Sequence, residues 1–323
     1  MQSLARFRHY FWPVVGLGAV VLSGWLLYRE IRNLSLDNVV DSLAAIPATH
    51  WALAVLATLV AYTALAEYDR IALIHLRKKI PWLFVMVTSF TTYALSHNIG
   101  ASLVSGAVIR FRAYGSRGMS PGEIGVLVGL TTFTFIIGAL TVGGIVMVIH
   151  PEILQRFFDV PDWLAIVAGL GMLAFVGFYM AGSLLHLRPL TIAGFHLYYP
   201  GFPVVLRQLI IGPLELVGAA AIIYFCLPEA GNPGFVVVLG VFVASFSVAI
   251  VSHAPGGLGV LEFVFLTALG DMDTAAVLAA LIVFRVFYLI VPLGLAIIVV
   301  LLFERSEFAR RRRETAEPPV PRP

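Results

Sequence analysis

The sequence predicts an all-α polytopic membrane protein, and two observations support this class. Of the 323 residues, 60% are hydrophobic and 12% are charged, whereas about a quarter of the residues in soluble globular domains are charged. A helix needs about 17–25 apolar residues to cross the hydrocarbon core of a bilayer. About eight hydrophobic segments approach or reach that length, at residues 11–28, 51–76, 81–97, 124–149, 162–185, 206–226, 235–252 and 275–303.

The first segment, 11–28, follows Arg6, Arg8 and His9, as the apolar core of a signal peptide would. Its apolar part is long and no small-residue cleavage site follows it, which favours a retained first helix. The connections between the later segments are too short for a soluble domain. We therefore expect any activity to take place in or beside the membrane.

The charged residues predict the orientation, because Lys and Arg accumulate in cytoplasmic loops. Basic residues cluster before 11–28, at 77–79, at 110–117, at 188–207 and after 303, whereas the loops at 151–162, 227–234 and 271–273 are acidic. These clusters agree on one orientation only if 81–109 and 235–270 turn back within the membrane. The limb 98–109 is indeed too short to span, at about 1.5 Å per residue.

The predicted plan is thus six full crossings plus two re-entrant hairpins. Two crossings, a hairpin and one crossing are followed by the same order upside down, as an inverted-topology repeat of about 1–150 and 151–305. Such repeats recur in transporters, whose two mirror-related states open to opposite sides. We expect one transmembrane domain, 1–305, and a basic, disordered cytoplasmic tail, 306–323, with both termini in the cytoplasm.

Both predicted hairpins carry the same short motif where they turn: Ser96-His97-x-x-Gly100 recurs as Ser252-His253-x-x-Gly256. A turning backbone leaves peptide groups without helical partners, which is costly in hydrocarbon. Polar side chains can bond these groups, and glycine and proline supply the turn geometry. The candidates are Ser96, His97, Asn98, Gly100, His253, Pro255, Gly256, Gly257 and Gly259. The two histidines either contact substrate or only close their own turns, and both alternatives stay open.

Among the ionisable residues of the predicted membrane segments, the candidates are Asp69, Glu215, Glu262 and Arg285, whereas Glu67 and Arg70 are one helical turn apart and are expected to pair locally. A charge at the bilayer centre costs at least about 2.5–3.5 kcal/mol, so each is expected to have a partner. We predict that Arg285 pairs with Glu262 or Glu215. Such a pair either lines a functional path or only fixes the packing of the helices.

Arg110 and Arg112 flank Phe111 at the predicted cytoplasmic mouth of the first hairpin. Guanidinium groups bind phosphate oxygens through paired hydrogen bonds, which makes both arginines candidates for a lipid phosphate. Ordinary positive-inside anchoring is the alternative. No metal site is expected, because neither hairpin histidine has a second ligand at metal spacing.

Four stretches resemble the membrane (flippase) domain of the bacterial lysylphosphatidylglycerol synthase/flippase family: "YALSHNIGASLVSGAVIRFRAYGSRGMSPGEI", "TFTFIIG", "SHAPGGLGVLE" and "FRVFYLIVPLGL". The resemblance covers about 51–303 and includes Tyr68-Asp69. It implies a multi-pass protein of the bacterial inner membrane that moves a phospholipid, in the family an aminoacylated phosphatidylglycerol, between leaflets. Glu215 stands where the resemblance implies Asp. Because the given sequence ends soon after Arg313, we expect a free-standing member of the family, without the soluble aminoacyl-transferase domain that the resemblance implies for the full-length synthases.

The leading hypothesis is a phospholipid translocator that moves an anionic or aminoacylated phospholipid, or a related lipid, between the leaflets of the inner membrane. The candidate residues of its headgroup path are Arg110, Arg112, His97, Asn98, Ser96, His253, Glu262, Arg285, Asp69 and Glu215. The expected partners are membrane phospholipids and no nucleic acid. A homo-oligomer and lipid-biosynthesis enzymes stay open as further partners.

There are two alternatives to this hypothesis. The first is a non-transporting membrane partner of lipid or hopanoid biosynthesis enzymes, in which the polar hairpins are structural. The second is an intramembrane transferase with His97 or His253 as the base. It is the weakest reading, because no dense acidic cluster that could hold magnesium diphosphate appears in a cytoplasmic loop. We expect no enzyme activity, because the aminoacyl-transferase domain of the full-length relatives is not expected here, and we expect no cofactor.

Overall fold

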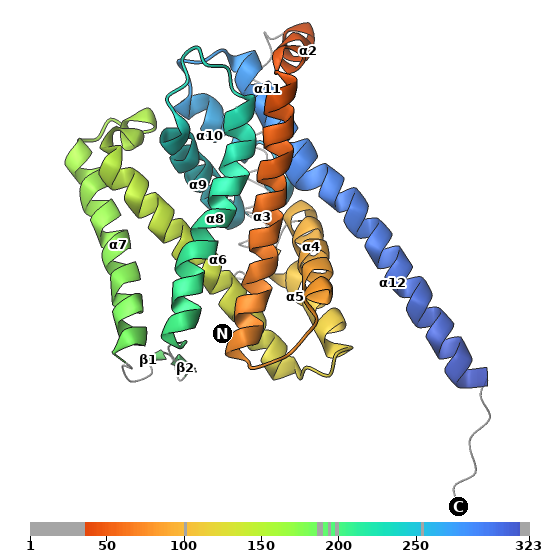
Figure 1. The fold of residues 1–323 in the computed structure, drawn as a ribbon. Helices are drawn as coiled ribbons and strands as arrows, with labels where there is room; N and C mark the ends of the chain where they lie inside the picture. Colours follow the sequence, from red (N-terminus) through yellow and green to blue (C-terminus); the bar gives the residue numbers. More distant parts are fainter. Residues whose placement is uncertain are drawn as a thin grey trace, which may run out of the picture.

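The structure, a computed structural model, describes residues 36–99, 102–185, 190–192, 195–197, 200–252 and 255–316. In this part of the chain, helices pack side by side, and two short antiparallel strands, β1 (Leu190–Ile192) and β2 (Phe195–Leu197), lie at the lower end of the bundle (Figure 1). The predicted first crossing, 11–28, lies outside the described residues, and so do Gly100 and His253.

The helices are joined by short connections. In chain order they are α2 (Leu36–Ala45), α3 (Ala48–His75), α4 (Trp82–Ile99), α5 (Ser102–Gly115), α6 (Pro121–Ile149), η1 (Pro151–Arg156), α7 (Asp162–Leu184), α8 (Phe202–Cys226), α9 (Phe235–Ser252), η2 (Pro255–Gly257), α10 (Val260–Ala268), α11 (Thr274–Phe284), η3 (Arg285–Ile290) and α12 (Val291–Ala316). Local signals fix several starts. Ser120 and Glu123 form a capping box at the start of α6, and the Asp273 side chain caps α11.

Six helices among the described residues are long and apolar enough to cross a membrane: α3, α6, α7, α8, α9 and the continuous helix Thr274–Phe303, which runs from α11 into α12. The prediction of an all-α polytopic membrane protein is thereby confirmed. Five of these helices coincide with predicted crossings, whereas α9 belongs to the predicted second hairpin. The re-entrant hairpins and the inverted repeat therefore stay predictions.

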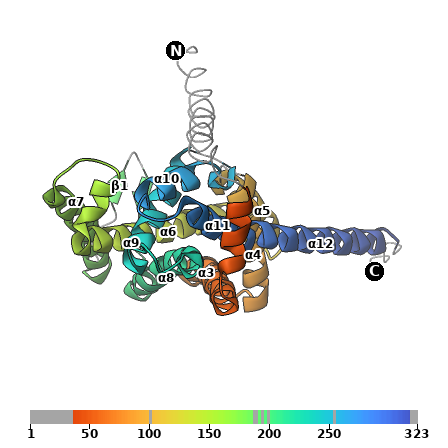
Figure 2. The same cartoon turned by 90° about the horizontal axis from the view of Figure 1, so that it is seen from above.

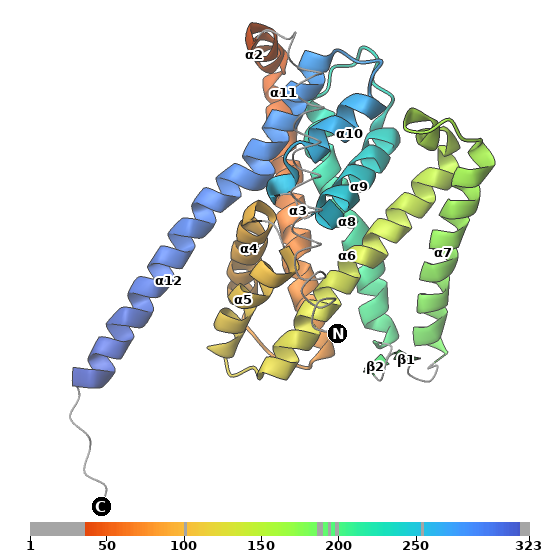
Figure 3. The same cartoon turned by 180° about the vertical axis from the view of Figure 1, so that it is seen from behind.

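The helices of the two predicted hairpins occupy different halves of the bundle. α4 and α5 lie side by side in the lower half, whereas α9 and α10 lie in the upper half (Figures 1 and 3). α4 also contacts η2 and η3, so elements of both predicted hairpins meet in the interior of the protein. This meeting point positions the site described below.

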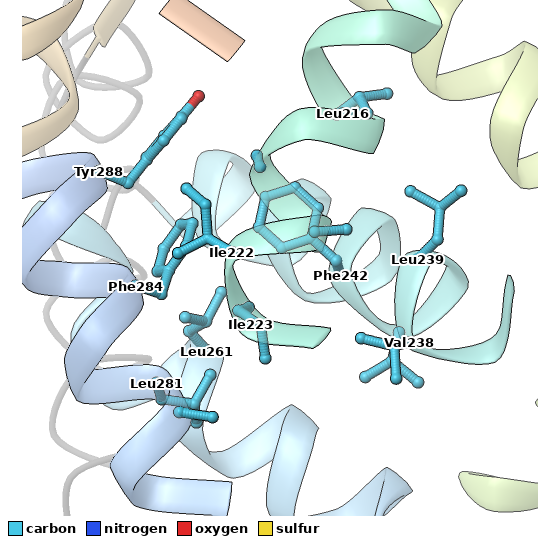
Figure 4. Packing of buried hydrophobic residues seen from close by; sticks show 14 of the residues in the cluster. Leu216, Ile222, Ile223, Val238, Leu239, Phe242, Leu261, Leu281, Phe284 and Tyr288 are labelled. Atoms are coloured by element: carbon cyan, nitrogen blue, oxygen red, sulfur yellow. The ribbon is translucent and has the colours of Figure 1, made fainter. Parts of the chain in front are cut away.

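α8 packs against α3 and α6 through glycines that allow the backbones to approach closely. A Cβ atom added to Gly138 of α6 would lie 2.5 Å from the carbonyl carbon of Gly212 in α8. One added to Gly218 would lie 2.9 Å from the backbone nitrogen of Ala61 in α3. α8 also contributes to the main apolar core, whose members in Figure 4 include Leu216, Ile222, Ile223, Phe242, Leu261, Leu281, Phe284 and Tyr288.

The crossing of α6 and α8 can be tested by adding one methyl group. We expect Gly138→Ala to lower the free energy of unfolding by about 1–3 kcal/mol, the usual range for overpacking a tight contact. Gly125→Ala is the matched control, because it lies in the same helix and its added Cβ would meet no heavy atom within 4 Å. Thermal unfolding of the purified variants in detergent measures the difference. Equal midpoints would contradict a close crossing at Gly138.

α12 continues as a helix to Ala316 and projects away from the bundle (Figures 1 and 2). The structure thus differs from the predicted disorder over 306–316, and 317–323 lie outside the described residues. The reason is that an established helix gains one hydrogen bond with each residue it adds. The Arg, Glu and Ala residues of this stretch are also good helix formers, so charge alone does not end the helix.

Candidate functional site

The candidate site is centred on η3, a π-helical turn of six residues inside the long helix formed by α11 and α12. Such turns are rare and often mark functional sites, because they widen the helix and redirect its side chains. The Asn98 side chain, at the end of α4, donates to the Leu289 carbonyl at 3.1 Å. From the other direction, Arg285 donates to the Gly256 carbonyl of η2 at 2.9 Å. η3 is therefore hydrogen-bonded to an element of each predicted hairpin, α4 of the first and η2 of the second.

Arg285 forms an ion pair with Glu262, as predicted. Its Nη2 atom also donates to the Gly257 carbonyl at 3.4 Å, and the second Glu262 oxygen accepts from the Gly259 backbone nitrogen at 2.9 Å. Gly256, Gly257 and Gly259 have φ angles of 59°, 62° and 78°, which L-residues with a Cβ rarely adopt. These glycines thus shape the turn, and Arg285 ties it to η3. Pro255 opens the turn as the first residue of η2.

A second buried ion pair joins Asp69 of α3 to Arg110 of α5, at 2.7 Å between Oδ1 and Nη2. Tyr114 donates to the other Asp69 oxygen at 2.8 Å, and the Arg110 guanidinium lies 4.9 Å from the centre of the Tyr93 ring. Asp69 and Arg110 are 0% and 4% exposed. The expectation of an accessible phosphate-binding guanidinium at Arg110 therefore requires correction. Arg112, two residues further along α5, is exposed.

Glu215 of α8 also contacts η3 and is 1% exposed. It accepts a hydrogen bond from the Tyr288 hydroxyl through Oε1, whereas its Oε2 atom is buried without a hydrogen-bond partner in the part of the chain that the structure describes. Tyr62 of α3 donates to the Tyr288 carbonyl at 2.8 Å. Arg285 therefore forms its ion pair with Glu262 and not with Glu215, the alternative partner.

His97 lies among aromatic rings at the end of α4. Its ring stacks on Tyr288 with a centroid separation of 5.5 Å and contacts Phe246 edge-on at 5.8 Å. Its Nδ1 atom is buried and has no hydrogen-bond partner among the described residues. Ser96 is buried, and its hydroxyl donates to the Tyr93 carbonyl of the same helix at 3.4 Å. His97 therefore does not close a turn through Nδ1, and a substrate contact stays a prediction.

The comparison with known proteins agrees with the motifs quoted above. Residues 14–296 match the family described as the lysylphosphatidylglycerol synthase TM region. The chain belongs to this family. It is 32% identical over 303 residues to an uncharacterized protein of Synechocystis sp., which covers 93% of this chain and 94% of the relative. It is also 30% identical over 262 residues to the inner membrane protein YbhN of Escherichia coli, covering 80% of this chain and 81% of that protein.

In this member of the lysylphosphatidylglycerol synthase TM family, one central site residue, Tyr288, could not be selected from the sequence. Tyr288 bonds Glu215 and stacks on His97, yet in the sequence it is one aromatic residue among several in "FRVFYLIVPLGL". The signal that could have selected it is its spacing, because it lies one helical turn after Arg285.

Among the described residues, no group of three or more His, Cys, Asp and Glu side chains could hold a metal ion.

Proposed function

We propose that this family member translocates a phospholipid between the leaflets of the bacterial inner membrane. The observation that supports this most strongly is the position of η3, which is bonded to α4 through Asn98 and to η2 through Arg285. A rotation or shift of this one turn would release or move both elements together. Coupled movement of two such elements is what alternating access requires of a transporter.

The composition of the site also supports a polar path. Asp69, Arg110, Glu215, Glu262 and Arg285 all lie in or beside helices long and apolar enough to span a membrane. Charges at membrane depth are expensive, and they usually face the interior of a bundle, where they mark the routes of substrates or ions. The name of the family links it to lysylphosphatidylglycerol, so we propose an anionic or aminoacylated phospholipid as the substrate. The proposal involves no chemical change of the lipid.

An apolar groove beside η3 offers a place for an acyl chain. A cavity of about 430 Å³ lies between α3, α4 and the junction of η3 with α12, and its walls include Leu59, Tyr62, Phe90, Phe287 and Leu295. Tyr62 links the two environments, because its ring lines the groove while its hydroxyl bonds η3. In this proposal the lipid tail stays in the groove while the headgroup passes the polar interior.

Arg112 is our choice for the first phosphate contact. Its side chain is exposed on α5, whereas the guanidinium of Arg110 is buried against Asp69. Basic residues near a membrane surface attract anionic lipid. We place this end of α5 and both chain termini on the cytoplasmic side, as the distribution of basic residues predicts.

Reconstitution into liposomes with fluorescent phospholipids tests the proposal, with phosphatidylglycerol, lysylphosphatidylglycerol and phosphatidylethanolamine compared. For at least one headgroup, we expect the rate of lipid transport to exceed the rate in protein-free liposomes. Asn98→Leu should slow this transport about tenfold, because it removes the hydrogen bond, worth about 1–1.5 kcal/mol, from Asn98 of α4 to the Leu289 carbonyl of η3. Leu170→Asn, on the exposed face of α7, is the control for a single polar change in a spanning helix. No transport of any headgroup would favour the non-transporting partner of lipid enzymes.

A further inference from the structure

Three acidic residues are buried in the part of the chain that the structure describes, and they differ in one respect. Asp69 is paired with Arg110, and Glu262 is paired with Arg285. Glu215 has no ion pair with any described residue, although it is almost completely buried. Its Oε1 atom accepts from the Tyr288 hydroxyl, and its Oε2 atom has no partner among the described side chains and backbone groups.

The groups that interact electrostatically with Glu215 are four tyrosines, which carry no positive charge: Tyr62 and Tyr68 from α3, Tyr93 from α4 and Tyr288 from η3. The imidazole of His97, from α4, stacks on the Tyr288 ring at a centroid separation of 5.5 Å and forms no ion pair with Glu215. Three arginines of α3, α5 and η3 pair with other carboxylates: Arg70 with Glu67, Arg110 with Asp69 and Arg285 with Glu262. The other helices packed against α8 are α6, α7, α9 and α11. α9 and α11 contain no titratable residue. The titratable groups of α6 and α7 are Glu123, which pairs with Lys78, and Asp162 and Tyr179, which bond Gln155 and Gln208.

We propose that Glu215 is a proton-binding site, neutral in the arrangement seen here, which exchanges its proton when η3 moves. An ionised carboxylate buried without a cation is very unfavourable, and such a group instead takes up a proton. The proton resides on Oε2, the oxygen that no donor occupies, while Oε1 keeps the hydrogen bond from Tyr288. On release the O–H bond breaks, the electron pair stays on the carboxylate, and the proton passes to water that reaches the site.

The link between protonation and movement lies in Tyr288. This residue connects Glu215 to the same six-residue turn that holds Asn98 through the Leu289 carbonyl and Gly256 through Arg285. Loss of the proton creates a buried negative charge, which favours an arrangement in which η3 shifts and admits water. The proton site itself does not depend on lipid transport, but its role in a transport cycle rests on the proposed function.

Infrared spectroscopy of the purified protein at neutral pH tests the site directly. A protonated carboxyl group has a carbonyl band that a carboxylate lacks, and this band shifts in heavy water. We expect the band in the wild type and in Glu215→Asp, and its loss in Glu215→Gln, which still offers an oxygen to Tyr288. Asp271→Asn is the matched control, because this carboxyl is 87% exposed. A wild type without the band, or a Glu215→Gln variant that retains it, would overturn the proposal.

Lipid transport under a proton gradient separates this proposal from the proposed function. We expect the gradient to change the wild-type rate and to have no effect on Glu215→Gln. If lipid moves at the same rate with and without the gradient in the wild type, coupling to Glu215 is refuted while the translocator stands. If the infrared band is present and no lipid moves, the proton site is supported and the translocator is refuted.

Discussion

Arg285→Met is expected to lower the free energy of unfolding by about 3–5 kcal/mol, because it leaves the buried Glu262 carboxylate without its cation. The same change removes the donors to the carbonyls of Gly256 and Gly257. Unfolding of the purified protein in detergent, followed by circular dichroism, measures the effect. Arg70→Met is the control, since it breaks an ion pair with Glu67 whose arginine side chain is 50% exposed. Exposed pairs contribute only about 0–1 kcal/mol.

The double variant Arg285→Met/Glu262→Leu shows whether the uncompensated charge causes this loss. Replacing both members of a buried ion pair by apolar residues is often neutral, whereas removing one is strongly destabilising. We therefore expect the double variant to be more stable than Arg285→Met alone. Equal stability of the two would contradict this explanation and assign the loss to the carbonyl contacts of η2.

Asp69→Leu is expected to cost about 3–5 kcal/mol as well, because it leaves the Arg110 guanidinium buried and unpaired. Here the double variant Asp69→Leu/Arg110→Met should recover only part of the loss. The Tyr114 hydroxyl, which donates to Asp69 at 2.8 Å, would still lack its acceptor, at about 1–3 kcal/mol. Adding Tyr114→Phe should restore more.

The same unfolding measurement applies to the Asp69 variants, with Glu67→Leu as the control two residues earlier in α3. Glu67 is partly exposed and pairs only with its neighbour Arg70 in the part of the chain that the structure describes. If Asp69→Leu and Glu67→Leu have equal effects, the Asp69–Arg110 pair contributes no more than an exposed pair. That result would contradict a buried, mutually compensating ion pair between α3 and α5.

The class of the protein and most of its helices follow from composition and segment length, because spanning helices must be long and apolar. The ion pair between Arg285 and Glu262 could be predicted for a related reason. Few charges lie in the membrane segments, and each needs a partner, so the number of possible pairs is small. The turn glycines of η2 were predictable from residue type alone, since few other residues accept their φ angles.

The arrangement around η3 could not be predicted in this way. Asn98 bonds a carbonyl 191 residues away, and Tyr62 bonds one 226 residues away. Backbone carbonyls carry no sequence signal, so only the packing of the helices reveals such contacts. Arg110 illustrates a second limit, because it and Arg112 look alike near the end of a helix. The direction of each side chain buries Arg110 against Asp69 and leaves Arg112 exposed.

Lipid transport by the double variant tests the central claim, that η3 couples the two predicted hairpins during translocation. Wild type and Arg285→Met/Glu262→Leu would be reconstituted at equal protein-to-lipid ratios, and the accessibility of fluorescent phospholipid in the outer leaflet followed over time. We expect rapid redistribution by the wild type. For the folded double variant, whose η2 turn is no longer tied to η3, we expect a rate close to that of protein-free liposomes. Equal rates for the two proteins would contradict coupling of the hairpins through η3.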